Sequence, residues 1–184
     1  SNNEESLYHM ISETWWEIIK LGAEINLIRD GQILPVGLTS YLEPLLNAEH
    51  GIDGYKVYKK ELEPINVDDQ EYKIKEIKLV VAKDKIPASF RGVWGQRKTM
   101  QVGDMFSDIR HEIKDRTFGY LRFDDALETK LEEAENRVHY GFVGRKTVVK
   151  RIRQFIKNSV DEFASDLGFV AESSERKTRN IANS

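Results

Sequence analysis

The chain has 184 residues, of which 40% are hydrophobic and 32% charged, and its formal net charge is −3. This apolar content suffices for one packed domain, or for one domain with a helical extension, and the acidic balance argues against wholesale nucleic-acid binding. The absence of cysteine excludes disulfide scaffolds, Cys-ligated zinc, iron–sulfur clusters and thiol nucleophiles. No apolar run approaches the roughly 18 residues that cross a bilayer. We therefore expect a cytoplasmic protein with no membrane partner.

The N-terminal segment begins with Ser1-Asn2-Asn3, which lacks both an initiator methionine and an apolar signal region. We expect the chain to be a piece of a longer protein. Apolar residues at helical spacing then predict one helix that ends near Gly22. Trp15 and Trp16 lie side by side in this helix, so one of them could face a neighbouring surface; a broadly buried helix is the plainer alternative.

A hairpin is the next element in the chain. Residues 24–28 and 32–36 flank Asp30-Gly31, a pair that readily adopts the positive φ angles of a tight turn. A short helix over 40–47, a strand over 55–58 and a polar loop over 64–70 follow.

The clearest strand spans residues 71–81, and its alternation changes phase halfway. Tyr72 and Ile74 share one register, whereas Ile77, Leu79 and Val81 share the other. A β-bulge at the intervening Lys75-Glu76 pair would keep both apolar sets on one face.

The second half of the chain combines a loop, a strand and helices. We expect a loop over 86–100 that leads into a strand or tight turn, a helix over 104–115 and a strand over 118–123. Asp124 or Asp125 can cap the next helix, and a final amphipathic helix runs over 147–167, where Gly168 ends it.

These elements together predict an α+β fold, with a mixed or antiparallel sheet, an N-terminal helix and two C-terminal helices. We divide the chain into an α+β domain over 1–123, a C-terminal helical pair over 124–168 packed on it, and a polar tail over 169–184.

The segment Gly92-Val-Trp-Gly-Gln-Arg-Lys-Thr-Met100 combines glycines with cationic donors. Alternation along an extended turn would place Gln96 and Lys98 on one side and Arg97 on the other, with Trp94 as an anchor. An amide beside an ammonium suits a phosphate. The plainer interpretation is an ordinary solvated turn.

Gly95-Gln96-Arg97-Lys98-Thr99 resembles the Gln-x-Lys loop in the transducer domain of the GHKL ATPases, a superfamily that includes gyrase, mismatch-repair, chaperone and bacterial defence ATPases. The resemblance implies that Gln96 and Lys98 sense the γ-phosphate of a nucleotide and that Lys98 contacts it. The nucleotide-binding half of that family has no counterpart in this sequence. ATP and Mg²⁺ would therefore be held by an N-terminal ATPase domain of the parent protein, and this chain alone would not be an enzyme.

A basic stripe marks the last helix. Lys150, Arg153 and Lys157 are spaced i, i+3, i+7 and so share one flank of the helix, where they could meet nucleic acid or an acidic partner. A merely solvated face is the alternative.

Two further functional hypotheses stay open. Glu71 and Lys73 have the Glu-x-Lys spacing of metal-dependent nucleases, with Asp53 or Asp69 as the second acid, although alternating charges on an exposed strand produce this spacing often. A purely structural homo-oligomerisation domain would use Trp15, Trp16 and the terminal helices. The leading hypothesis is a non-catalytic coupling module of a larger ATP-dependent, DNA-linked protein.

Overall fold

A computed structural model of the chain describes residues 2–109, 112–135, 142–144 and 146–169. It confirms the α+β class and contains a five-stranded sheet in the order β3-β4-β7-β5-β6. The strands are β3 (Lys56–Val67), β4 (Gln70–Val81), β5 (Gly92–Arg97), β6 (Met100–Phe106) and β7 (Thr117–Phe123). Strand β5 runs parallel to β7, and the other three neighbouring pairs are antiparallel. The sheet is therefore mixed.

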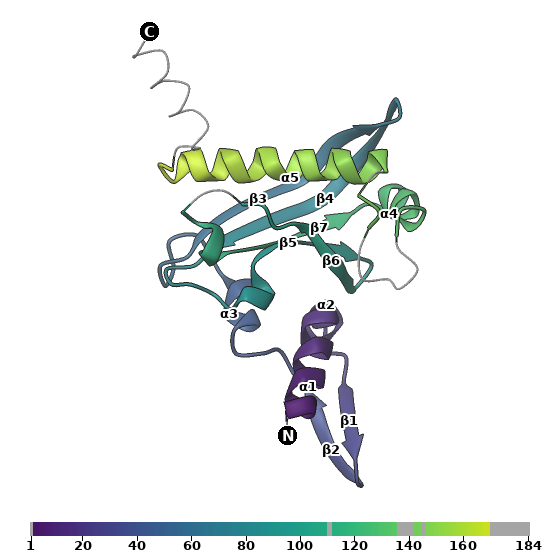
Figure 1. Cartoon of the computed structure of the whole chain (residues 1–184), viewed down its shortest axis with the longest axis vertical. Coiled ribbons are helices and arrows are strands. Elements are labelled where there is room, and N and C mark those ends of the chain that lie inside the picture. The colour runs from purple at the N-terminus through teal and green to yellow at the C-terminus, as the bar shows by residue number, and fades with distance from the viewer. Residues whose placement is uncertain (1, 110–111, 136–141, 145, 170–184) are drawn as a thin grey trace.

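Helices cover both faces of this sheet. Helix α5 (Thr147–Asp166) lies along one face with α4 (Asp125–Glu132) near one end, whereas α3 (Leu42–Asn47) and the N-terminal segment lie on the other side (Figure 1). No helix among the described residues is long and apolar enough to cross a membrane.

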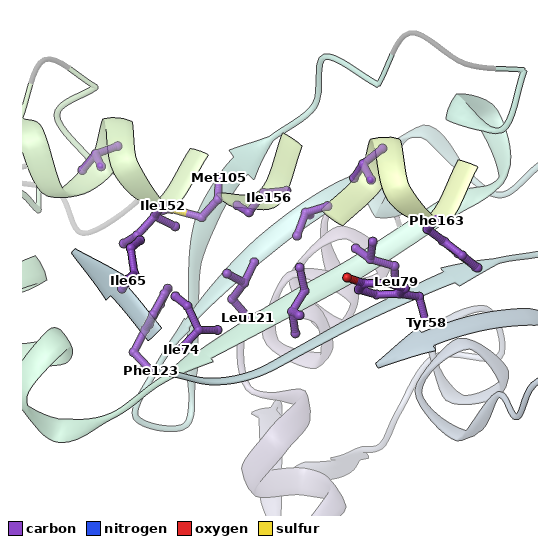
Figure 2. Packing of buried hydrophobic residues seen from close by; sticks show 14 of the residues in the cluster. Tyr58, Ile65, Ile74, Leu79, Met105, Leu121, Phe123, Ile152, Ile156 and Phe163 are labelled. Atoms are coloured by element: carbon purple, nitrogen blue, oxygen red, sulfur yellow. The ribbon is translucent and has the colours of Figure 1, made fainter. Parts of the chain in front are cut away.

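The larger core forms between α5 and the sheet. Ile152, Ile156 and Phe163 point from α5 towards strand residues such as Ile74 and Leu121 (Figure 2). Fully burying one such side chain stabilises the fold by about 1.5–3 kcal/mol. The predicted amphipathic helix over 147–167 is thus confirmed, and Gly168, at φ +84°, follows its end as predicted.

A smaller core lies on the opposite face, where α3 and Trp16 pack against Phe118 and Tyr120. The rings of Trp16 and Tyr120 are 5.1 Å apart. This contact corrects the prediction of one N-terminal helix. The structure has α1 (Asn2–Thr14) and α2 (Trp16–Lys20), separated at Trp15, and Trp16 is buried against the sheet.

The predicted hairpin is confirmed as β1 (Ile25–Arg29) and β2 (Gln32–Val36), a separate two-stranded sheet. The predicted bulge is also confirmed, because the pairing of β4 with β7 shifts register between Ile74 and Glu76. That shift keeps Ile74 and Ile77 in the same core. Asp124 caps α4 as expected, since its side chain accepts a bond from the Leu127 N–H.

The prediction of a polar loop over 64–70 was wrong. The polar loop over 64–70 is a continuation of β3 to Val67, followed by a tight turn at Asp68 and Asp69, whose φ angles are +51° and +62°. Both are the positive angles of a hairpin turn. Pro64 fits there because β3 is an edge strand, where a missing N–H is tolerated.

The predicted helix over 104–115 was also wrong. Strand β6 continues through Phe106, and within the described part of 107–116 only the single 3₁₀ turn η2 (Lys114–Arg116) is helical. The segment up to Phe106 is a strand and not a helix because β6 forms hydrogen bonds with β5. Residues 170–184 of the predicted polar tail lie outside the described residues.

Candidate functional site

The turn between β5 and β6 carries the cationic residues of the 92–100 segment. Arg97 pairs with Met100, so Lys98 and Thr99 form a two-residue turn at the end of the hairpin. Lys98 has an exposed side chain and a φ of +55°. A left-handed conformation costs a residue with a side chain about 1–2 kcal/mol, and such strain tends to collect at functional sites.

Three carboxylates of the α4 region hold this turn. The Lys98 backbone N–H donates to Glu128 Oε1 at 2.7 Å. Arg97 reaches Glu135 with Nε at 2.8 Å and Glu132 with Nη1 at 3.3 Å. We call these contacts of Arg97 and Lys98 with Glu128, Glu132 and Glu135 the α4 clamp. The side chains of Arg97 and Glu135 are only 16% and 5% exposed, so this pair is much less weakened by solvent than a surface ion pair.

Gln96 lies on the other side of β5 from Arg97. Gly95, between Trp94 and Gln96, faces the larger core beneath α5, because a Cβ added to it would touch Met105. Strand alternation therefore turns Trp94 and Gln96 towards the opposite face. Trp94 packs against the smaller core, in agreement with its predicted anchoring position. Gln96 has no exposed surface, and neither polar atom of its amide has a hydrogen-bond partner among the described residues. A phosphate could reach this amide only if the hairpin moved.

Replacing Gln96 with leucine is expected to stabilise the chain. An unpartnered buried polar group costs about 1–3 kcal/mol, and an apolar side chain of similar size removes that cost. Urea unfolding measures the gain. The matched control is Gln154→Leu, an exposed glutamine on α5, which should change the free energy of unfolding by less than about 0.5 kcal/mol. A destabilised Gln96→Leu variant would mean that the amide has a partner in solution.

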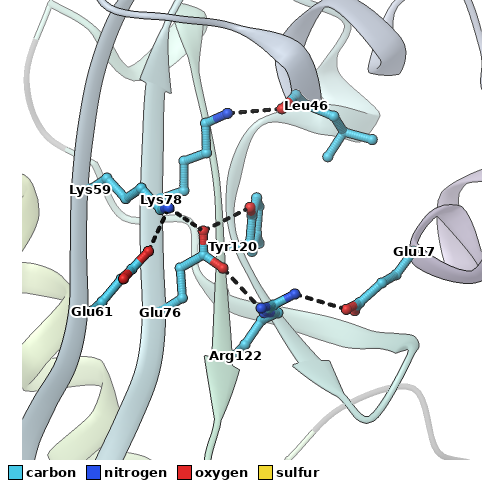
Figure 3. A network of polar contacts seen from close by, with 8 residues as sticks. All are labelled: Glu17, Leu46, Lys59, Glu61, Glu76, Lys78, Tyr120 and Arg122. Atoms are coloured by element: carbon cyan, nitrogen blue, oxygen red, sulfur yellow. Dashed lines mark hydrogen bonds and ion pairs between the residues drawn. The ribbon is translucent and has the colours of Figure 1, made fainter. Parts of the chain in front are cut away.

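A network of polar side chains occupies the sheet face near α2 (Figure 3). Glu76 is buried on β4; it accepts a bond from the Tyr120 hydroxyl at 3.2 Å and pairs with Arg122 Nε at 3.1 Å. Arg122 also bonds Glu17 Oε1 at 3.0 Å, and Lys59 lies 3.6 Å from Glu76. The network therefore ties the N-terminal segment to the centre of the sheet.

Burial shifts the titration of several network members. It raises the pKa of the Tyr120 hydroxyl, with the Glu76 carboxylate acting in the same direction. It lowers the pKa of Lys78, whose ammonium donates to the Leu46 carbonyl at 2.8 Å. It raises the pKa of Glu17 against the opposing effect of Arg122. Sequence reasoning missed this network, and its only signal was the run of alternating charges along β4.

Glu17 gives the network a testable pH dependence. Because the folded pKa of this carboxyl lies above its ordinary value, the folded state holds the proton more tightly, and that contribution to stability is lost as pH rises through the raised pKa. Glu17→Gln removes the titration. We expect the variant to gain stability relative to the parent chain between about pH 4 and pH 7. Unfolding curves of the variant and the parent chain at both pH values check this. If the variant instead lost stability relative to the parent chain over this interval, the raised pKa would be contradicted.

The predicted basic stripe on α5 is not continuous. Arg153 turns inward, where its Nε donates to the Met105 carbonyl at 3.1 Å, and Lys157 forms an ion pair with Asp161. Of the three predicted residues, only Lys150 is both exposed and without a described partner. Helical spacing placed the three correctly on one flank, but it could not show that β6 and Asp161 engage two of them.

The residues of the nuclease hypothesis lie at the β3–β4 turn and at the start of β4, whereas the alternative acid Asp53 lies in the turn before β3. Asp69 lies in the β3–β4 turn, and Glu71 and Lys73 are exposed on β4 just after it. The described residues contain no group of three or more histidine, aspartate or glutamate side chains that could hold a metal ion. The nuclease hypothesis, which needs only one acid pair and a lysine, stays a prediction.

The oligomerisation hypothesis loses one of its anchors. Trp16 is 4% exposed, and its indole N–H donates to Gln101 Oε1 at 3.3 Å within the same chain. Exposed apolar side chains include Ile28, Ile33 and Leu34 on the β1–β2 hairpin, and Leu7 and Met10 on α1.

Comparisons of the sequence with models of protein families and with curated proteins find no match.

Proposed function

We propose that this chain is a non-catalytic coupling module of a larger ATP-dependent protein, and that Lys98 contacts the γ-phosphate of a nucleotide held by another domain. The observation that carries the proposal is the conformation of Lys98. It combines an exposed ammonium with a strained, left-handed backbone at the tip of a tight turn. Glycine or asparagine would relieve that strain, so a lysine at this position is better explained by its charge than by stability.

The chemistry of phosphoryl transfer fits a contact of this kind. Negative charge is spread over the oxygens of the transferred group, and a fixed cation stabilises it by position and electrostatics. Lys98 has a rigid base for this task because its own N–H is bonded to Glu128. Loss of the phosphate after hydrolysis would remove the attraction that favours one position of the turn.

The α4 clamp supplies the mechanical connection. Displacement of the turn would pull on Glu132 and Glu135 through Arg97. The buried side of α4, with Leu127 and Leu131, shares the larger core with α5. A change at the phosphate would thus reach the helical layer through contiguous packing, which is how coupling between sites is physically carried.

Gln96 adds a reason for the hairpin to move. Its amide is buried without a partner in the described part of the chain, and β5 and β6 shift register at two points, between Val93 and Trp94 and between Gly95 and Gln96. Bulges of this kind occur next to functional sites, where they redirect a side chain. The proposal is tested by ATP turnover in a protein that contains both the nucleotide domain and this chain, with the Lys98 ammonium removed.

A further inference from the structure

The exposed surface at the start of α5 carries three cations that have no partner in the described structure. Lys146, Lys150 and Arg151 are all exposed, and no side-chain hydrogen bond or ion pair joins any of them to another described residue. We call these three residues the α5 basic surface. It replaces the predicted stripe, because Arg153 and Lys157 are already engaged.

Intramolecular stability does not account for this arrangement. Lys146 and Lys150 are one helical turn apart, and like charges at this spacing destabilise a helix. Further along α5, Lys157 is balanced by Asp161 at i+4, whereas the corresponding position after Lys150 is the neutral Gln154. A cluster left unbalanced in a chain of net charge −3 indicates an anionic partner.

The form of the surface favours a polyanion over a membrane. The apolar side of α5 is buried in the larger core, and the exposed residues between Lys146 and Asn158 are all polar, so no side chain is available to enter a bilayer. Lys146 and Lys150 are separated by about 6 Å along the helix axis. That rise is close to the rise of about 7 Å along the duplex axis between alternate phosphates of one DNA strand.

We propose that the α5 basic surface binds the phosphate backbone of nucleic acid without reading its sequence. The negative charge of the remaining molecule confines the contact to this surface. Each cation that neutralises a phosphate releases counterions, so three contacts give a slope of log affinity against log salt of about −3. This binding does not depend on the proposed role of Lys98.

The test uses a fluorescent 20-base-pair duplex, with anisotropy measured from low to physiological salt. One variant combines Lys146→Gln, Lys150→Gln and Arg151→Gln. The control combines Lys56→Gln, Lys75→Gln and Lys114→Gln, which removes the same charge from exposed positions elsewhere. Thermal unfolding verifies that both variants fold.

We expect the first variant to lose affinity at low salt by about tenfold or more and to bring the salt slope close to zero. The control should keep the slope of the parent chain. Equal losses in both variants would overturn the proposal, since net charge alone would then explain binding. Undetectable binding by the parent chain would also overturn it, as would binding of polyglutamate of matched charge as tightly as the duplex.

Discussion

Replacing Arg97 with alanine is expected to lower the free energy of unfolding by about 1.5–3 kcal/mol, the range for hydrogen bonds to charged groups. The substitution removes the guanidinium that joins the β5–β6 hairpin to Glu132 and Glu135. Because the Glu135 side chain is only 5% exposed, water replaces the lost partner poorly. Arg97→Lys should recover only part of the loss, since an ammonium cannot reproduce the fork of the guanidinium.

Chemical denaturation of the parent chain and the variants gives these differences. Lys130→Ala is the matched control. This cation lies on α4 itself, and its contacts to Asp68 and Glu133, at 3.7 and 3.9 Å, involve more exposed carboxylates. It should cost less than about 1 kcal/mol. If Arg97→Ala is no more destabilising than Lys130→Ala, the α4 clamp does not hold the hairpin in solution.

The elements that could be predicted from sequence are those determined by local pattern. The apolar side of α5 repeats at helical spacing over twenty residues. Asp30-Gly31 specifies the turn that lies directly between β1 and β2. Even the bulge in β4 has a local signal, because the phase of alternation changes around Lys75-Glu76. Periodicity alone carries this information.

The elements that were missed depend on distant partners. Strand β5 is an inner strand only because it lies parallel to β7, with Gln96 opposite Arg122, and nothing local to the 92–97 segment shows that pairing. The extension of β3 through Pro64 depends on its place at the sheet edge. In each case tertiary contacts outweigh local preference.

The candidate site divides in the same way. The opposite directions of Gln96 and Arg97 follow from strand alternation and could be predicted, but the burial of Gln96 could not. The pairing of Glu76 with Arg122 joins residues that are far apart in sequence and depends on the register of β4 against β7. A charge pattern does not determine such a register.

Removal of the Lys98 ammonium is expected to have the largest functional effect. In a protein that contains both the nucleotide domain and this chain, Lys98→Ala should lower ATP turnover by about 10²-fold or more, the usual effect of losing one preorganised contact to developing charge. Lys98→Gly should lose turnover equally while stabilising the fold, because glycine adopts the +55° φ angle without strain. A loss of turnover in the more stable variant would separate function from folding.

The most direct measurement of the central claim is therefore steady-state ATP turnover in that protein, comparing Lys98→Ala with Lys73→Ala, which removes an exposed lysine from β4 instead. Phosphate sensing by the turn predicts that turnover falls about a hundredfold for Lys98→Ala and stays unchanged for Lys73→Ala. Turnover that is the same in both variants as in the parent protein would contradict the proposal that Lys98 contacts the γ-phosphate.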